Sequence, residues 1–168
     1  MSAVFDLNGC KERIRSILSS ANTTTATYPL SDNMDTNVAF ISKFNPDMVF
    51  NQVTQYPSVH IYSERKSIDQ TDISLNQLNA RRNGVLELNI LGICAEYNIE
   101  NNNEDKGQKN CEILMENIEL NLRANPNLQS FSGVRWQRPR DVQYGIAAFQ
   151  EDAYFRTGVM TIDINIFY

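Results

Sequence analysis

Few side chains in this sequence could act as nucleophiles, bases or metal ligands. It has one histidine, His60, and three cysteines, Cys10, Cys94 and Cys111. Any Ser-His-Asp or Cys-His arrangement within one chain would therefore have to use His60, which we predict to be a partly exposed histidine on a β-strand. The cysteines are odd in number and lack CxxC spacing, which argues against a disulfide framework and a zinc site. We expect them to be reduced and buried, and we expect no cofactor.

Acidic side chains offer one arrangement that resembles an enzyme site. Asp141, Glu151 and Asp152 could hold a hard divalent cation, as the carboxylates of metal-dependent nucleases do. The surrounding segment is rich in turn residues, where solvated charges are the commoner explanation, so catalysis is the weaker interpretation. The seven glycines are dispersed and form neither GxGxxG nor GxxxxGK[ST], which excludes those two phosphate-binding motifs.

Three further acids, Glu112, Glu116 and Glu119, are spaced to share one face of a predicted helix. The simpler interpretation is a solvated helix face. The alternative is a stripe that faces the lumen of an assembly, where it would repel passing DNA.

Basic residues gather at two places, Arg81-Arg82 and the group Arg135, Arg138 and Arg140 around Trp136, in a chain of net charge -5. Arginine beside an aromatic residue is typical of protein interface anchors and also of single-stranded nucleic-acid binding. Nucleic-acid binding usually needs a clustered positive surface, which this chain lacks. We therefore favour the protein interface and keep a nucleic-acid-binding module built on Arg135, Trp136 and Arg138 as an alternative.

Hydrophobic periodicity predicts most of the secondary structure. We expect two amphipathic helices, at 2–20 and 107–124, and a short helix at 44–53. We expect strands at 57–62, 85–97, 133–145 and 160–168. Between them we expect an irregular connector or arm at 21–37, a long polar loop or hairpin arm at 64–84 and an irregular stretch at 146–155.

This order predicts an α+β fold: a mainly antiparallel sheet of about four strands with helices packed on one face, plus an irregular N-terminal arm. We expect one domain over 1–168, with the helix and arm in 1–56 and the sheet and main helix in 57–168. The sequence shows no apolar run long enough to span a bilayer and no signal peptide, so we expect no membrane contact and assembly in a cytoplasm.

Residues 57 to 168 carry the segments PSVHIY, RRNGVLELNILG, CEILMENI and RTGVMTIDINIFY in that order. This layout resembles the tail terminator proteins of long-tailed bacteriophages. The resemblance rests on the order of the elements and on a last strand that ends in an aromatic residue.

The resemblance implies a homo-oligomeric ring, expected to be a hexamer, that caps the tail tube, stops its polymerisation and provides a docking surface for the head or neck. Its partners would be the tail tube protein, a neck or head-completion protein, the tail sheath if the tail is contractile, and DNA only in transit. It implies a place in the tail or neck of the virion, assembly in the host cytoplasm, and no enzyme activity or cofactor. The alternatives are a head-to-tail joining protein of the neck, the nuclease and the nucleic-acid-binding module.

Overall fold

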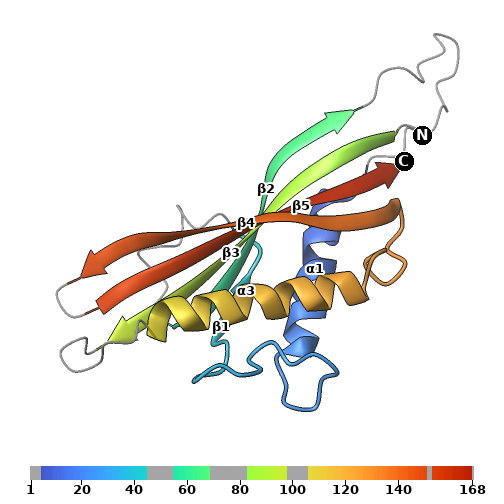
Figure 1. The fold of residues 1–168 in the computed structure, drawn as a ribbon. Coiled ribbons are helices and arrows are strands. Elements are labelled where there is room, and N and C mark those ends of the chain that lie inside the picture. Colours follow the sequence, from blue (N-terminus) through green and yellow to red (C-terminus); the bar gives the residue numbers. More distant parts are fainter. Residues whose placement is uncertain (1–4, 45–54, 69–82, 98–105, 151–152, 168) are drawn as a thin grey trace, which may run out of the picture.

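The computed structural model describes residues 5–44, 55–68, 83–97, 106–150 and 153–167. The predicted short helix at 44–53 and most of the polar segment at 64–84 lie outside these residues. The described elements are α1 (Leu7–Ala21), β1 (Phe40–Ser42), β2 (Ser58–Ile68), β3 (Asn83–Tyr97), α3 (Lys106–Ala124), β4 (Val134–Gln150) and β5 (Ala153–Phe167) (Figure 1).

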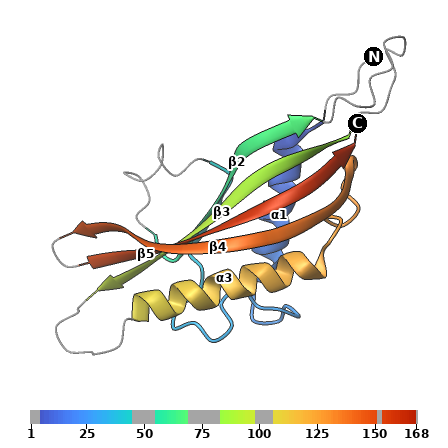
Figure 2. The ribbon, with the colours of Figure 1, turned by 45° about the horizontal axis from the view of Figure 1, so that its top comes forward.

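The strands form one five-stranded sheet in the order β1-β2-β3-β5-β4. β1 is parallel to β2, and all other pairs are antiparallel. Figure 2 shows the sheet above α3, with α1 crossing behind it, and the buried side chains of both helices join one core with alternate residues of the strands. The predicted α+β fold with helices packed against the sheet is confirmed. The fifth strand, β1, lies in the segment that we expected to be an irregular arm.

The C-terminal strand occupies the interior of the sheet. β5 pairs with β3 along one side and with β4 along the other, so its backbone is hydrogen-bonded on both sides. Its alternating residues Met160, Ile162, Ile164 and Ile166 are fully buried on the helix side. The chain therefore reaches its last described residue, Phe167, within a central strand.

The predicted irregular stretch at 146–155 is wrong, because β4 continues to Gln150 and β5 begins at Ala153. β4 is an edge strand with register shifts between Val134 and Trp136, between Pro139 and Asp141 and between Ile146 and Ala148. Each bulge adds one residue and inverts the alternation of the two faces. The sequence of β4 consequently lacks the period of two by which strands are predicted.

A pair of glycines lets α3 approach the sheet closely. Gly92 of β3 lies opposite Gly158 of β5, and both lie beneath Met115 of α3. A Cβ atom at Gly158 would come within 2.5 Å of Met115 Cγ, and one at Gly92 within 2.9 Å of Met115 Sδ. Both distances are shorter than a van der Waals contact, so these two positions require residues without a side chain.

The segment between α1 and β1 is irregular, as predicted, but it packs against the domain. Asn117 of α3 donates hydrogen bonds from Nδ2 to the carbonyl oxygens of Leu30 (3.1 Å) and Asp32 (2.9 Å). Asn121 donates in the same way to Tyr28 (2.9 Å). Leu30 is also fully buried. Of the two predicted possibilities, a connector or an arm, these residues form a packed connector, because α3 supplies donors for carbonyl groups that no regular structure satisfies.

Candidate interaction surface

One face of the sheet carries no helix among the described residues, and we call it the open face. The registers of the strands place on it the side chains that alternate with the helix-facing core. Its members include His60, Tyr62, Glu87, Asn89, Leu91, Trp136, Arg138, Asp141, Val159, Thr161, Asp163 and Phe167. This face brings together predicted site residues from β2 and β4, among them His60, Trp136 and Arg138.

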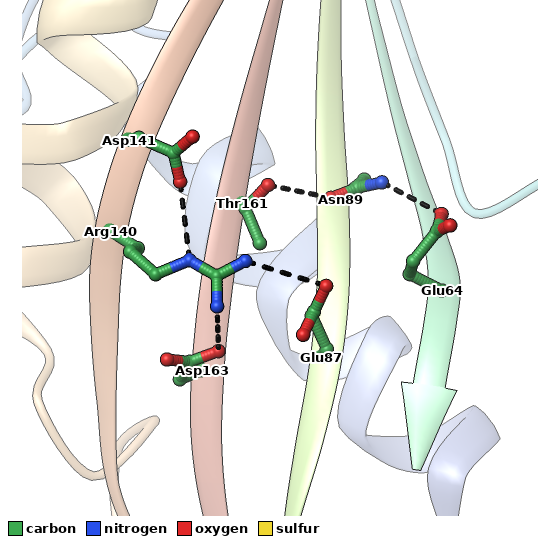
Figure 3. Close-up of polar contacts among 7 residues, drawn as sticks. All are labelled: Glu64, Glu87, Asn89, Arg140, Asp141, Thr161 and Asp163. Carbon is green, nitrogen blue, oxygen red and sulfur yellow. Dashed lines mark hydrogen bonds and ion pairs between the residues drawn. The ribbon is translucent and has the colours of Figure 1, made fainter.

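A polar chain crosses the middle of the open face (Figure 3). Thr161 of β5 donates a hydrogen bond from Oγ1 to Asn89 Oδ1 (3.1 Å), and Asn89 of β3 donates from Nδ2 to Glu64 Oε2 of β2 (2.9 Å). Each group has a partner from a neighbouring strand. These hydrogen bonds therefore link β5, β3 and β2, and they leave the three side chains little capacity to bind a ligand.

Arg140 is surrounded by three carboxylates beside this chain (Figure 3). Its Nε lies 3.2 Å from Asp141 Oδ1, and its two terminal nitrogens lie 3.6 Å from Asp163 Oδ1 and 3.4 Å from Glu87 Oε1. The hydrogen bond to Asp141 and the charges of the other two acids raise the pKa of Arg140. These ion pairs link β4 to β3 and β5. Because three carboxylates surround one guanidinium, the local net charge is negative and Arg140 offers no uncompensated positive charge to a partner.

The other predicted arginines lie at one end of the open face, around Trp136. The Trp136 side chain is 43% exposed, and the guanidinium of Arg135 lies 5.3 Å from the ring centroid of Phe167. Arg138 is exposed and takes part in no ion pair within the described part of the chain. We call Arg135, Trp136, Arg138 and Phe167 the Trp136 surface. The structure thus brings Arg135, Trp136 and Arg138 together at this end of the face, while Arg140, which follows on the same face, is paired with carboxylates. Arg81 and Arg82 lie outside the described residues.

The three predicted acids Glu112, Glu116 and Glu119 share one face of α3 and lie near Tyr144 of β4. Burial, and to a smaller extent the nearby Cys111 thiol and these three glutamates, raise the pKa of Tyr144. Glu112 accepts a hydrogen bond from Gln108 Nε2 (2.7 Å), and Glu119 pairs with Arg123 (2.6 Å). The acidic stripe therefore flanks the outer edge of the sheet on the helix side, away from the open face.

His60 is fully buried, so the prediction of a partly exposed histidine is wrong. Its Nδ1 lies 2.8 Å from Ser42 Oγ, its Nε2 lies 3.1 Å from Ser58 Oγ, and the Phe40 ring centroid lies 6.0 Å from its own. β1, which the sequence did not predict, supplies two of these neighbours. Burial lowers the pKa of His60. Both ring nitrogens are occupied by serines, so His60 ties β1 to β2 and is not placed to act as a base.

The nuclease alternative uses Asp141, Glu151 and Asp152. Asp141 lies on β4, and its carboxylate pairs with Arg140 at 3.2 Å. Glu151 and Asp152 lie outside the described residues. Across the described ranges, no group of His, Cys, Asp and Glu side chains is arranged to hold one.

The three cysteines are free and buried, as predicted. The Cys94 thiol of β3 shares a hydrogen bond with the Cys111 thiol of α3, and this bond together with burial raises the pKa of Cys94. Burial, aided by the charge of Asp6, raises the pKa of Cys10 to about 12. The raised pKa values of Cys10 and Cys94 mean that these two thiols are not activated as nucleophiles.

A small apolar cluster lies on the open face, outside the set of predicted site residues. Leu91, Ile93 and Phe155 are buried there, with the rings of Tyr56 and Tyr62 packed against them. Tyr56 and Phe155 contact each other at a ring-centroid separation of 4.9 Å. The signal in the sequence was the apolar run on both faces of β3 around Leu91 and Ile93, which indicates a strand covered on both sides.

Comparison of the sequence with models of known protein families gives no match, and comparison with curated proteins gives none either. Neither described helix combines the length and the apolar composition needed to cross a membrane. The geometry of this chain therefore carries the functional argument.

Proposed function

We propose that this protein is a tail terminator of a long-tailed bacteriophage. In this role it forms a ring that caps the tail tube, stops its polymerisation and offers a docking surface to the head or neck. It acts by surface complementarity, without catalysis or a cofactor. The observation that carries the proposal is the order of the elements: a helix, a long strand pair, the main helix and a second strand pair whose last strand lies in the interior of the sheet.

The function requires two unlike surfaces on one subunit. A growing tube presents the same binding surface after every added ring, so a cap must match that surface on one side and differ from it on the other. This chain offers one sheet side covered by helices and one open face whose Trp136 surface is exposed. An exposed tryptophan flanked by arginines is typical of an anchor for a protein partner.

Two observations favour this proposal over the alternatives from other classes. Asp141, the member of the nuclease alternative that the structure describes, pairs with Arg140, and no group of side chains in the described ranges is arranged to hold a metal ion. The nucleic-acid-binding module has two arginines, Arg135 and Arg138, in an acidic chain, and the neighbouring Arg140 cannot add to them because it pairs with Glu87, Asp141 and Asp163. Two phosphate contacts are few compared with what tight binding requires.

Deletion of the gene from its phage tests the proposal. The mutant should accumulate DNA-filled heads together with tails of abnormal, often excessive length, measured by electron microscopy of lysates. Complementation with the intact gene should restore one tail length. If the mutant makes tails of normal length and its heads only leak DNA or fail to join, the terminator proposal is wrong and the protein is a head-to-tail joining protein of the neck.

A further inference from the structure

The two edges of the sheet carry different surfaces. At one edge, Tyr144 and Ile146 of β4 are exposed by 46% and 62%. The register places both on the helix side of β4, and Tyr144 lies beside Glu112, Glu116 and Glu119. We call these five residues the β4 edge surface. It combines apolar side chains with three carboxylates, of which only Glu119 has an ion-pair partner among the described residues.

The opposite edge, at β1, combines exposed aromatic rings with positive charge. Phe40 and Phe44 are exposed by 37% and 60%. Next to them, Lys43 Nζ lies 3.0 Å from Glu12 Oε2, and Arg15 of α1 pairs with the same carboxylate. Two cations around one acid leave a net positive charge. We call Glu12, Arg15, Phe40, Lys43 and Phe44 the β1 edge surface.

We infer that the β4 edge surface of one subunit packs against the β1 edge surface of a second copy of this chain. The two surfaces are complementary in charge, and each exposes apolar groups that isolated monomers rarely leave in contiguous patches. Contact between two β4 edges would place glutamates against glutamates, which is unfavourable. Because the two surfaces differ and lie at opposite ends of the strand order, the contact is heterologous and repeats from subunit to subunit until a rotation closes it.

This inference rests on the proposed function and specifies how its subunits meet. The inferred contact places Glu112, Glu116 and Glu119 between two subunits and not in the lumen of the ring. A water-filled lumen would leave Tyr144 and Ile146 exposed beside the glutamates, whereas a subunit contact buries them. The same contact supplies Glu116, which is exposed on α3, with a cation.

Zero-length carbodiimide cross-linking tests the contact, because it joins a carboxylate directly to an amine. Equal amounts of ¹⁴N-labelled and ¹⁵N-labelled protein are mixed, cross-linked alone and in the presence of purified tail tubes, and analysed by mass spectrometry. We expect mixed-isotope peptides that join Lys43 to a glutamate of the β4 edge surface. Cross-links only between two β1 edges, only at other positions, or a protein that stays monomeric under both conditions would overturn the inference.

Charge reversal supplies an independent test. Glu116→Lys should weaken self-association by about tenfold or more, because it places like charges across the contact. Adding Lys43→Glu in the same chain should restore association, since every contact then pairs opposite charges again. Asp32→Lys, an equal charge change in the exposed connector, is the matched control and should leave association unchanged; circular dichroism confirms that each variant is folded.

The failure of this contact is distinguishable from the failure of the proposed function. If Glu116→Lys leaves association unchanged but deletion of the gene still produces overlong tails, the contact is wrong and the terminator function stands. If the charge pair behaves as expected but the deletion leaves tail length normal, the chain forms the inferred contact in another role.

Discussion

Replacement of Gly158 by alanine tests how closely α3 lies against the sheet. The added Cβ would lie 2.5 Å from Met115 Cγ and 3.2 Å from both Met115 Sδ and Tyr144 Cε1, where carbon atoms prefer about 3.5 to 4.0 Å. Met115 is fully buried, so its side chain cannot move into solvent to make room. Overpacking of this kind costs about 1 to 3 kcal/mol, a large share of a domain stability of about 5 to 15 kcal/mol.

Gly145→Ala is the matched control. A Cβ at Gly145 would meet only Thr157 Oγ1, at 3.6 Å, and neither this glycine nor Gly158 has the positive φ that would strain an alanine. We expect Gly145→Ala to change stability by less than about 0.5 kcal/mol. Urea denaturation at 25 °C followed by circular dichroism should show a lower midpoint for Gly158→Ala with an unchanged slope. Equal midpoints for the two variants would refute the close approach of α3 at Met115.

Three further predictions concern the stability of the domain. Removal of residues 164–168 deletes Ile164 and Ile166 from the central strand, each worth about 1.5 to 3 kcal/mol, and should give insoluble or unfolded protein; an unchanged melting temperature would contradict the position of β5. Asn117→Ala leaves two carbonyls of the connector without their donor and should cost about 1 to 3 kcal/mol, whereas Asn110→Ala, which loses only exposed contacts of 3.4 Å, should melt near the wild type; equal melting temperatures would contradict this role. Because burial lowers the pKa of His60 below its ordinary value of 6.5, the unfolded chain takes up its proton first, so the stability is fully present above pH 6.5 and declines below it. His60→Gln should therefore lose less stability between pH 6.5 and about 5 in urea titrations, and equal losses would show that His60 is not buried in its neutral form.

The parts of the fold that could be predicted from the sequence are those in which one face is buried along the whole element. α3 and β5 present uninterrupted apolar periodicities, and β3 alternates before it becomes apolar on both faces. In each case the period of the side chains matches the geometry of the element. These elements were predicted with nearly correct boundaries except for β5, whose first half lies against the irregular edge strand.

The elements that were missed depend on contacts distant in sequence. β1 has three residues, too few to produce a period, and it exists because β2 offers an unpaired edge. The burial of His60 follows from β1 and could not be predicted without it. The bulges of β4 interrupt the alternation of apolar and polar side chains along the strand. No feature of the local sequence indicates where an edge strand will carry a bulge.

The candidate site was predictable in composition and unpredictable in geometry. The proximity of Arg135, Trp136 and Arg138 follows from their spacing in the chain. The ion pairs of Arg140 depend on Glu87 and Asp163, which lie near it only through the pairing of β3, β5 and β4. The strand register is therefore needed to distinguish the arginine that pairs within the sheet from the exposed arginines beside Trp136.

Electron microscopy of growing tail tubes tests the central claim most directly. Purified protein carrying a gold label is added to tail tube protein during polymerisation, and the position of the label and the lengths of the tubes are measured. The proposed terminator should label one end of each tube and stop its elongation, in proportion to the protein added. Label distributed along the tubes, or tubes that elongate unchanged at a saturating amount of this protein, would contradict the proposed function.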